Sequence, residues 1–173
     1  MSGTRVAAYC LDTSGFSNPL ENLPEDIFAS LWAQVMKVVE AGKLCCNTEI
    51  LTELGSIEGK LGECLKSCAE SMCYEIGDDK WPWAEYLDCV EKLKAKYESV
   101  ISEYNGNRKG TVGLNDISII ALAMTLKLPI VSMEKPNTYQ PSVKKMRIPD
   151  VCKIEDVHHL SFNEFLRAEG ISI

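Results

Sequence analysis

Two short apolar runs, each followed at once by polar side chains, constrain the fold of this chain most strongly. Residues 6–11 are rich in strand formers and lead directly to Asp12, and residues 129–131 lead to Ser132 and Glu134. Segments with helical spacing of apolar residues lie between these runs and after them. Strands that alternate with helices predict a parallel sheet, and functional groups of such sheets collect at the carboxyl ends of the strands.

The rest of the chain supplies the helices that this alternation requires. Apolar residues recur at spacings of three and four, and capping residues or glycines bound several of the segments. Asn47 or Thr48 is expected to cap the second helix, and Ser161 with Glu164 forms a capping box for the last. A short extended segment is expected at residues 43–46. The expected helices cover residues 27–39, 50–54, most of 56–105, 117–126 and 161–169.

Length and hydropathy predict one soluble domain. The chain has 173 residues, 46% of them hydrophobic, which suffices for one core. We interpret residues 1–173 as a single domain in which residues 56–105 form a helical insertion. The apolar run that begins at Val6 is too short for a secretory signal, and no stretch approaches the length of a membrane span. These features favour a cytoplasmic protein without a membrane partner.

Eight cysteines in a chain of this kind are expected to be reduced thiols, because the cytosol keeps disulfides open. Cys64, Cys68 and Cys73 raise the question of a zinc site. Their spacing differs from that of a zinc knuckle, and the two histidines, His158 and His159, lie far away in sequence. We therefore interpret the three cysteines as small buried hydrophobes, and the two histidines as surface or packing residues.

The net charge of −7 argues against a protein that grips nucleic acid through a broad basic face. It does not argue against a nuclease whose site is built from carboxylates, since bound divalent cations invert the local charge. Local basic clusters are present. Lys144, Lys145 and Arg147 are the candidates for guiding a nucleic-acid backbone, with a solvated surface loop as the simpler interpretation.

Four acidic residues stand at the boundaries or on the faces of expected elements. Asp12 and Glu134 follow strands, Glu53 lies on the second helix, and Asp116 stands at the entry to a later helix. A solvated surface carboxylate is the ordinary interpretation of any one of them. Together they offer the hard oxygen ligands that Mg²⁺ shares with substrate phosphates in a phosphodiesterase.

The order of these residues resembles the PIN-domain family. Three segments carry the resemblance: Leu11-Asp12-Thr13-Ser14, then Thr52-Glu53-Leu54-Gly55, and then Asn115-Asp116 with its small-residue helix and the strand that ends at Ser132-Met133-Glu134. The chain also has the Ile-Pro-Asp-Val-Cys segment, residues 148–152, of a longer branch of PIN-like proteins. Residues 56–105 match no segment of the family. Ser132 and Glu134 stand where many members have Thr and Asp.

The resemblance implies a three-layer α/β/α fold and a metal-dependent endoribonuclease of the VapC toxin type. Asp12, Glu53 and Asp116 would bind one or two Mg²⁺ or Mn²⁺ ions, and Glu134 would complete the catalytic set. A metal-bound water would attack the phosphodiester of an RNA substrate. The hydroxyl and amide groups of Ser14, Asn115 and Ser132 would orient ligands or waters. An antitoxin protein and a homodimer are the partners that the resemblance implies.

Three alternatives stay open at the level of sequence. Glu49 lies one helical turn before Glu53 on the same face and competes with it as the second acid. The chain could also be a PIN-like protein that has lost catalysis and binds RNA or protein. A phosphatase ranks third, because Ser14 occupies the place where haloacid-dehalogenase-like phosphatases have a second Asp.

Overall fold

The computed structural model describes residues 7–137 and 144–173 of the chain, so that Val6, the first residue of the expected strand, lies outside them. The strands are β1 (Tyr9–Leu11), β2 (Leu44–Cys45), β3 (Ile130–Val131) and β4 (His159–Leu160). The helices are α1 (Ser14–Asn22), α2 (Ala29–Glu40), α3 (Thr48–Leu54), α4 (Gly59–Ser67), α5 (Ala69–Met72), α6 (Trp83–Lys96), the 3-10 helix η1 (Ser102–Asn105), α7 (Leu114–Leu126), α8 (Ile148–Ile154) and α9 (Phe162–Ala168).

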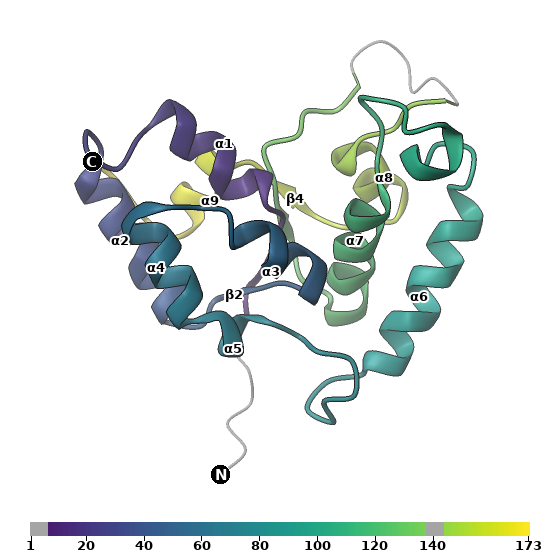
Figure 1. The fold of residues 1–173 in the computed structure, drawn as a ribbon, viewed down its shortest axis with the longest axis horizontal. Helices are drawn as coiled ribbons and strands as arrows, with labels where there is room; N and C mark the ends of the chain where they lie inside the picture. Colours follow the sequence, from purple (N-terminus) through teal and green to yellow (C-terminus); the bar gives the residue numbers. More distant parts are fainter. Residues whose placement is uncertain (1–6, 138–143) are drawn as a thin grey trace.

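The four strands form one parallel sheet in the order β2-β1-β3-β4. Cys10 pairs with Cys45 on one side and with Ile130 on the other, which places β1 in the middle of the sheet. Helices cover both faces: α1, α2, α4 and α9 lie on one side, and α6, α7 and α8 lie on the other (Figure 1). The predicted α/β class with a central parallel sheet between helical layers is confirmed.

Aromatic side chains fill the layer between the sheet and α1, α2 and α9. Phe16, Trp32, Phe162 and Phe165 are each 1% exposed or less, and their rings contact one another at centroid distances of 5.4 to 6.4 Å. Tyr9 extends the cluster with an edge-on contact to Phe165. Rings of this size bury much apolar area, so this packing holds β1 against the terminal helix.

The other layer is built around α7, which is buried between the sheet and α6. Residues 117–123 of α7 are all buried, which explains why its sequence is apolar all round rather than on one stripe. The helix begins where the Asp116 carboxylate accepts a hydrogen bond from the backbone N–H of Gly113 at 2.8 Å. Since α7 packs on the sheet, its first turn lies fixed beside the strand ends.

Three elements are present that the sequence analysis did not expect. Helix α1 forms although it contains Pro19, α8 forms over the Ile-Pro-Asp-Val-Cys segment, and β4 forms from only two residues. Residues 56–105 contain α4, α5, α6 and η1 and are mostly helical, as expected. The expected helix at residues 27–39 begins later, at Ala29. In the described part of the chain, no helix is long and apolar enough to cross a membrane.

Candidate active site

Asp12 lies at the carboxyl end of the central strand and is 5% exposed. Its backbone N–H donates to the carbonyl of Val131 at 3.0 Å, so the pairing of β1 with β3 continues one residue beyond the strands. The Ser14 hydroxyl donates to Asp12 Oδ2 at 2.5 Å, and the Ser14 N–H approaches the same oxygen at 3.2 Å. The first turn of α1 therefore fixes the direction of the Asp12 carboxylate.

The Ser14 hydroxyl also links the ends of two neighbouring strands. Ser14 Oγ accepts a hydrogen bond from the N–H of Met133 at 3.1 Å while it donates to Asp12. The adjacent Gly15 allows this approach, because a Cβ at that position would lie 2.8 Å from the Val131 carbonyl oxygen. A single serine thus connects the β1 carboxylate to the segment that follows β3.

Glu53 reaches the same region from α3. Both of its carboxylate oxygens accept hydrogen bonds, Oε2 from the Thr13 hydroxyl at 2.6 Å and Oε1 from the Asn115 amide at 2.7 Å. Glu49 is exposed, and its negative charge contributes to the raised pKa of Tyr86 in α6. Of the two acids on α3, the structure brings Glu53 to the strand ends.

The charges that act on Asp116 indicate that the four acids share one site. Burial raises the pKa of Asp116 to about 7, and the negative charges of Glu134, Asp12 and Glu53 raise it as well, against the hydrogen bond from Gly113 that lowers it. Burial and the charge of Glu53 likewise raise the pKa of Asp12, although hydrogen bonds from Ser14 oppose them. We call Asp12, Glu53, Asp116 and Glu134 the acidic site.

Glu134 closes the acidic site on the β3 side. Its Oε2 accepts a hydrogen bond from the N–H of Ile148 at 2.8 Å, which ties it to the start of α8. Its pKa is raised by burial and by the charge of Asp12, while that N–H and the guanidinium of Arg147 act in the opposite direction. Glu134 is therefore the member of the acidic site that has a basic neighbour.

Ser132 and His159 lie next to Glu134 at the ends of β3 and β4. The Ser132 hydroxyl and His159 Nε2 are 2.6 Å apart, and the backbone N–H of Glu134 donates to Ser132 Oγ at 3.3 Å. Ser132 is fully buried, and burial lowers the pKa of the His159 ring. The interpretation of His159 as a surface or packing residue is incomplete, because its ring supports the segment that carries Glu134.

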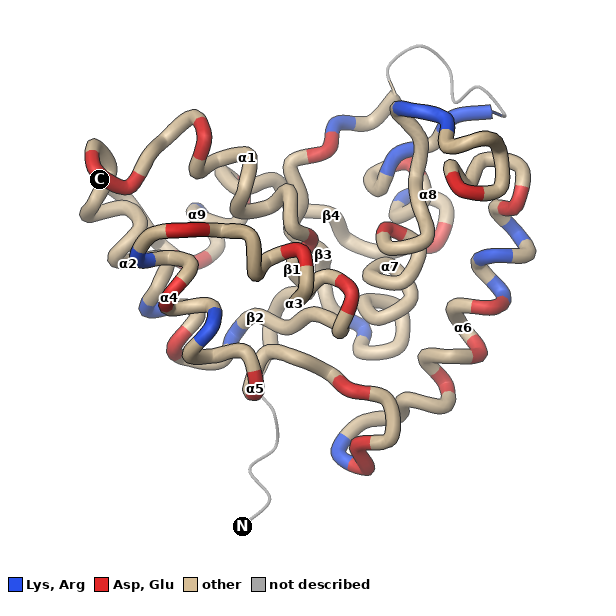
Figure 2. The backbone as a smooth tube through the Cα atoms, in the orientation of Figure 1, with Lys and Arg blue, Asp and Glu red and all other residues tan. Residues whose placement is uncertain are grey.

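The basic residues of the loop before α8 are exposed at the rim. Lys144, Lys145 and Arg147 are all exposed, and Arg108 donates to the Lys144 carbonyl at 3.2 Å. Basic positions gather beside this loop, whereas on α6 they alternate with acidic ones (Figure 2). The positive charge of Arg147 acts to lower the pKa of Glu134, which shows that this basic cluster lies beside the acidic site.

The acidic site fits a hard divalent cation in its donor chemistry. All four members offer carboxylate oxygens, and burial together with neighbouring negative charges raises the pKa values of Asp12, Asp116 and Glu134, a repulsion that a bound dication would relieve. Among residues 7–137 and 144–173, no three His, Cys, Asp or Glu side chains are gathered closely enough to hold a metal ion in this conformation. Mg²⁺ commonly takes only one or two carboxylates together with waters and phosphates, so binding of such an ion does not require three of these acids at once.

Two other features lie apart from the acidic site. Cys64 is near Cys68, whereas Cys73 lies near Cys46 and Thr48, so the three cysteines considered for zinc are not brought together. A cavity of about 850 Å³ is lined by α1, α2 and the start of α4 and includes none of the four acids. Neither feature contributes groups to the acidic chemistry.

Sequence reasoning missed three residues that support the acidic site. Thr13 and Asn47 were considered only as part of a motif and as a helix cap, and His159 was set aside. The position of Thr13 directly after Asp12 could have indicated its role. Asn47 and His159 gave no such signal, because their partners are distant in sequence and depend on how the elements pack.

Comparison with known proteins gives a family and distant likenesses to solved structures. The model of a family described as "Domain of unknown function (DUF4411)" matches residues 9–173. No match was found among curated proteins. One similar solved structure is VapBC2 from Rickettsia felis bound to a DNA fragment from its promoter, with 15% identity, 89% of this chain and 98% of that chain covered, and a TM-score of 0.47. A score of this size at this identity establishes neither a shared fold nor a shared activity.

Proposed function

We propose that this chain, which belongs to the family described as domain of unknown function DUF4411, is a metal-dependent nuclease that hydrolyses RNA phosphodiester bonds. The observation that carries the proposal is the set of four carboxylates at the carboxyl ends of β1 and β3, where burial and then the charges of the other three acids raise the pKa of Asp116 to about 7. Acids with pKa values perturbed in this way are typical of functional sites.

The proposal assigns Asp12, Glu53 and Asp116 to the binding of one or two Mg²⁺ or Mn²⁺ ions. When bound, such an ion polarises a phosphate and lowers the pKa of a coordinated water. Glu134 completes the acidic site on the β3 side. The chain's own contribution is to keep these carboxylates correctly directed.

Hydrogen bonds from hydroxyl and amide groups provide that direction. Ser14 holds Asp12, and Thr13 and Asn115 hold the two oxygens of Glu53. Each of these bonds leaves further lone pairs on the carboxylate for a cation or a water. Ser132 acts more indirectly, because it contacts the backbone of Glu134 rather than the carboxylate. Groups of this kind commonly tune the ligands that they orient.

The basic cluster supports a polyanionic substrate. Lys144, Lys145 and Arg147 are exposed beside the acidic site, where they can contact the phosphates that flank the scissile bond. We propose single-stranded RNA as the substrate on the strength of the resemblance to PIN-domain nucleases. The same resemblance, carried by the segments around Asp12, Glu53 and Asp116, supports a cytoplasmic toxin that an antitoxin protein inhibits, and a homodimer.

The first experiment measures cleavage of labelled RNAs and single-stranded DNAs with Mg²⁺ or Mn²⁺, with and without EDTA. The expected result is metal-dependent cutting of RNA that is lost in Asp116→Asn. Calorimetry with Mn²⁺ on the same proteins separates binding from catalysis. Metal binding without cleavage of any substrate would replace the nuclease with a non-catalytic binding module, and absence of both would overturn the metal site itself.

A second experiment tests the substrate contacts. Lys144→Ala and Lys145→Ala together should weaken RNA binding at low salt and reduce the salt dependence of binding by about two phosphate contacts. Lys92→Ala serves as the control, because Lys92 pairs with Asp88 on the exposed face of α6. Equal salt dependence in all variants would contradict a role of the loop in phosphate binding.

The toxin part of the proposal is tested in cells. Controlled expression of the wild-type protein should arrest growth, whereas Asp116→Asn should not, at equal protein levels. Arrest that persists in Asp116→Asn would separate toxicity from the acidic site. Unimpaired growth with the active wild-type enzyme would contradict the toxin assignment and leave the nuclease assignment standing.

A further inference from the structure

A closed set of contacts links the two helices that carry Glu53 and Asp116. Asn47 caps α3 by accepting the N–H of Ile50 at 3.0 Å, and its amide donates to the Ser118 hydroxyl of α7 at 2.8 Å. The Ser118 hydroxyl donates to the Asn115 carbonyl at 2.7 Å. The Asn115 amide then donates to Glu53, which returns the contacts to α3.

We propose that Asn47 is a positioning residue of the acidic site, which sets the distance between the acids of α3 and α7 without touching substrate or metal. This inference rests on the proposed function and assigns a role within it. The seven-residue helix α3 transmits the position of its cap to Glu53, because a short, regularly hydrogen-bonded helix moves as a unit.

Burial makes this arrangement specific. Asn47 is 2% exposed and Ser118 is 7% exposed, and both ends of the Asn47 amide are bonded. A buried amide donor or acceptor that loses its partner is costly, so α3 cannot shift along α7 without breaking one of these bonds. A hydrophobic side chain at position 47 would allow such sliding.

The amide of Asn47 has a second acceptor, the Tyr86 hydroxyl of α6, at 3.2 Å. Tyr86 is 4% exposed and belongs to the helical region 56–105 that matched nothing in the resemblance. Through Tyr86, α6 supports the same asparagine that holds α3 on α7. The region thus has a specific part in forming the acidic site, besides covering α7.

The test compares Mn²⁺ affinity, cleavage and thermal unfolding in two variants that break the set of contacts differently. Asn47→Ser retains a good helix cap, but its shorter side chain lacks the amide group that donates to Ser118. Ser118→Ala retains the whole Asn47 side chain and its cap. Both should weaken Mn²⁺ binding by about 10-fold, the lower end of the effect of groups that orient metal ligands.

The matched control is Thr125→Ala, which removes another hydroxyl that donates to a backbone carbonyl within α7. It should leave Mn²⁺ affinity unchanged. The variant pair Asn47→Ser and Asn115→Ala tests the route of the effect. In the Asn115→Ala background, Asn47→Ser should have no further effect on Mn²⁺ affinity, while its effect on unfolding temperature should remain.

Three outcomes would overturn the inference. Unchanged Mn²⁺ affinity in both Asn47→Ser and Ser118→Ala overturns the positioning role and leaves the proposed function intact. Fully additive effects of Asn47→Ser and Asn115→Ala show that Asn47 does not act through Asn115. Absence of Mn²⁺ binding by the wild-type protein overturns the proposed metal site, and the positioning role falls with it.

Discussion

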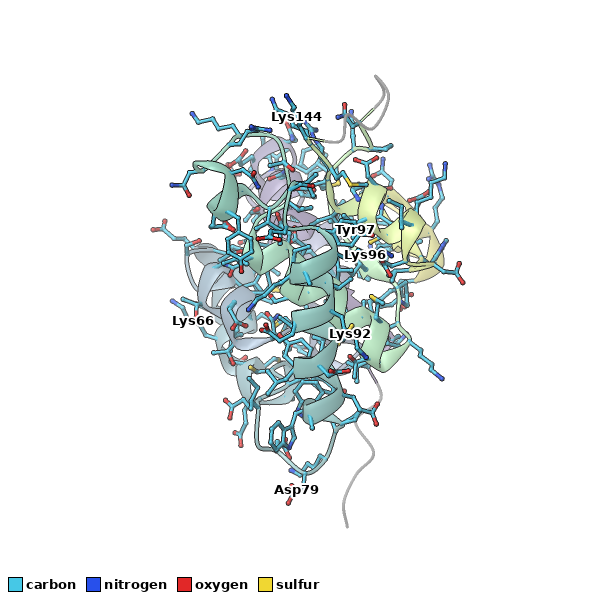
Figure 3. All side chains as sticks on the ribbon, turned by 90° about the vertical axis from the view of Figure 1, so that its right-hand side faces the viewer. Lys66, Asp79, Lys92, Lys96, Tyr97 and Lys144 are labelled. Carbon is cyan, nitrogen blue, oxygen red and sulfur yellow. The ribbon has the colours of Figure 1, made fainter. Side chains whose placement is uncertain are left out.

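The fold shifts the pKa values of carboxylates in opposite directions at the acidic site and at the periphery of the molecule. Glu155, at the end of α8, accepts hydrogen bonds from Lys96 at 2.6 Å and Tyr97 at 2.5 Å, and both donors lie on the edge of α6 that faces α8 (Figure 3). Burial alone would raise the pKa of Glu155, but these partners lower it. Asp12 and Asp116 have raised pKa values because burial and neighbouring acids dominate.

Glu169 repeats the peripheral arrangement at the other edge of the molecule. Its carboxylate accepts hydrogen bonds from Lys43 at 2.7 Å and Tyr9 at 2.6 Å, and its pKa is lowered despite burial. At Glu155 and at Glu169, the fold supplies a lysine and a tyrosine. In the acidic site it supplies hydroxyls, amides and backbone N–H groups, and Glu134 has the cationic neighbour Arg147. The comparison indicates that the fold accepts a cost in stability at the acidic site, as the proposed cation binding requires.

The largest expected effect comes from Asp116→Asn. The amide retains the shape and the acceptor for Gly113 but removes a charge from the acidic site. We expect cleavage to fall by about 100-fold, or about 3 kcal/mol, because the metal-stabilised charge is lost. The unfolding temperature of the metal-free protein should rise by about 2–4 °C, since repulsion is relieved.

A loss of activity with a lower unfolding temperature would contradict this contrast. In that case Asp116 would be a stabilising residue like Glu155, and its raised pKa would not reflect a functional arrangement. Circular dichroism of the metal-free proteins and single-turnover cleavage of one RNA measure the two quantities separately.

The next largest effect is expected at Glu53, and Glu49 on the same helix is its control. Glu53→Gln should weaken Mn²⁺ binding by about 10-fold, because Glu53 belongs to the acidic site. Glu49→Gln, one turn away, should leave Mn²⁺ affinity unchanged, because Glu49 acts on Tyr86 instead. Calorimetry on the two variants side by side decides between the alternatives that the sequence left open. Equal loss in both would show a general effect of charge on α3.

The comparison also predicts how stability depends on pH. The folded-state pKa of Asp116 is about 7 and lies above its ordinary value of 3.8, so the folded protein holds this proton more tightly than the unfolded chain. The contribution of Asp116 to stability is therefore complete below about pH 4 and is lost as the pH rises through 7. Between pH 5 and 8, the unfolding temperature of the metal-free protein should fall.

Saturating Mg²⁺ should reduce the fall in unfolding temperature between pH 5 and 8, because it neutralises the acids. Asp116→Asn should reduce this fall as well, because it removes one ionisable carboxylate. The pKa values of Glu155 and Glu169 are lowered, so their contributions are lost only as the pH falls below their usual range. Measurement between pH 5 and 8 therefore avoids these two carboxylates, whereas His159, whose pKa is lowered, contributes there with the opposite sign. A pH profile that is the same with and without Mg²⁺ would argue against cation binding there.

The elements that carry the acids were predictable, and several that support them were not. Asp12, Asp116 and Glu134 stand at element boundaries that apolar runs and capping residues mark in the sequence. Helix α1 was missed because Gly15 and Pro19 disfavour a helix locally, and packing of Phe16 against the aromatic core overrides that preference. The two-residue strand β4 is too short to show a period.

Within the acidic site, the sequence suggested which carboxylates to consider but not what holds them. The bonds from Thr13 and Asn115 to Glu53 join residues 40 and 62 positions apart, and they depend on the packing of α3 on α7. The contact of Ser132 with His159 depends on the register of β3 and β4. The catalytic roles of the four acids stay predictions.

The smallest expected effect is at the periphery. Glu155→Gln removes the ion pair with Lys96 and should destabilise the protein by about 1 kcal/mol, because Glu155 is largely buried although Lys96 is half exposed. Asp88→Asn, which breaks a fully exposed pair with Lys92, should cause no measurable change. Both variants should cleave RNA and bind Mn²⁺ like the wild type. A loss of Mn²⁺ affinity in Glu155→Gln would break the comparison, because it would mean that α8 transmits the peripheral ion pair to Glu134.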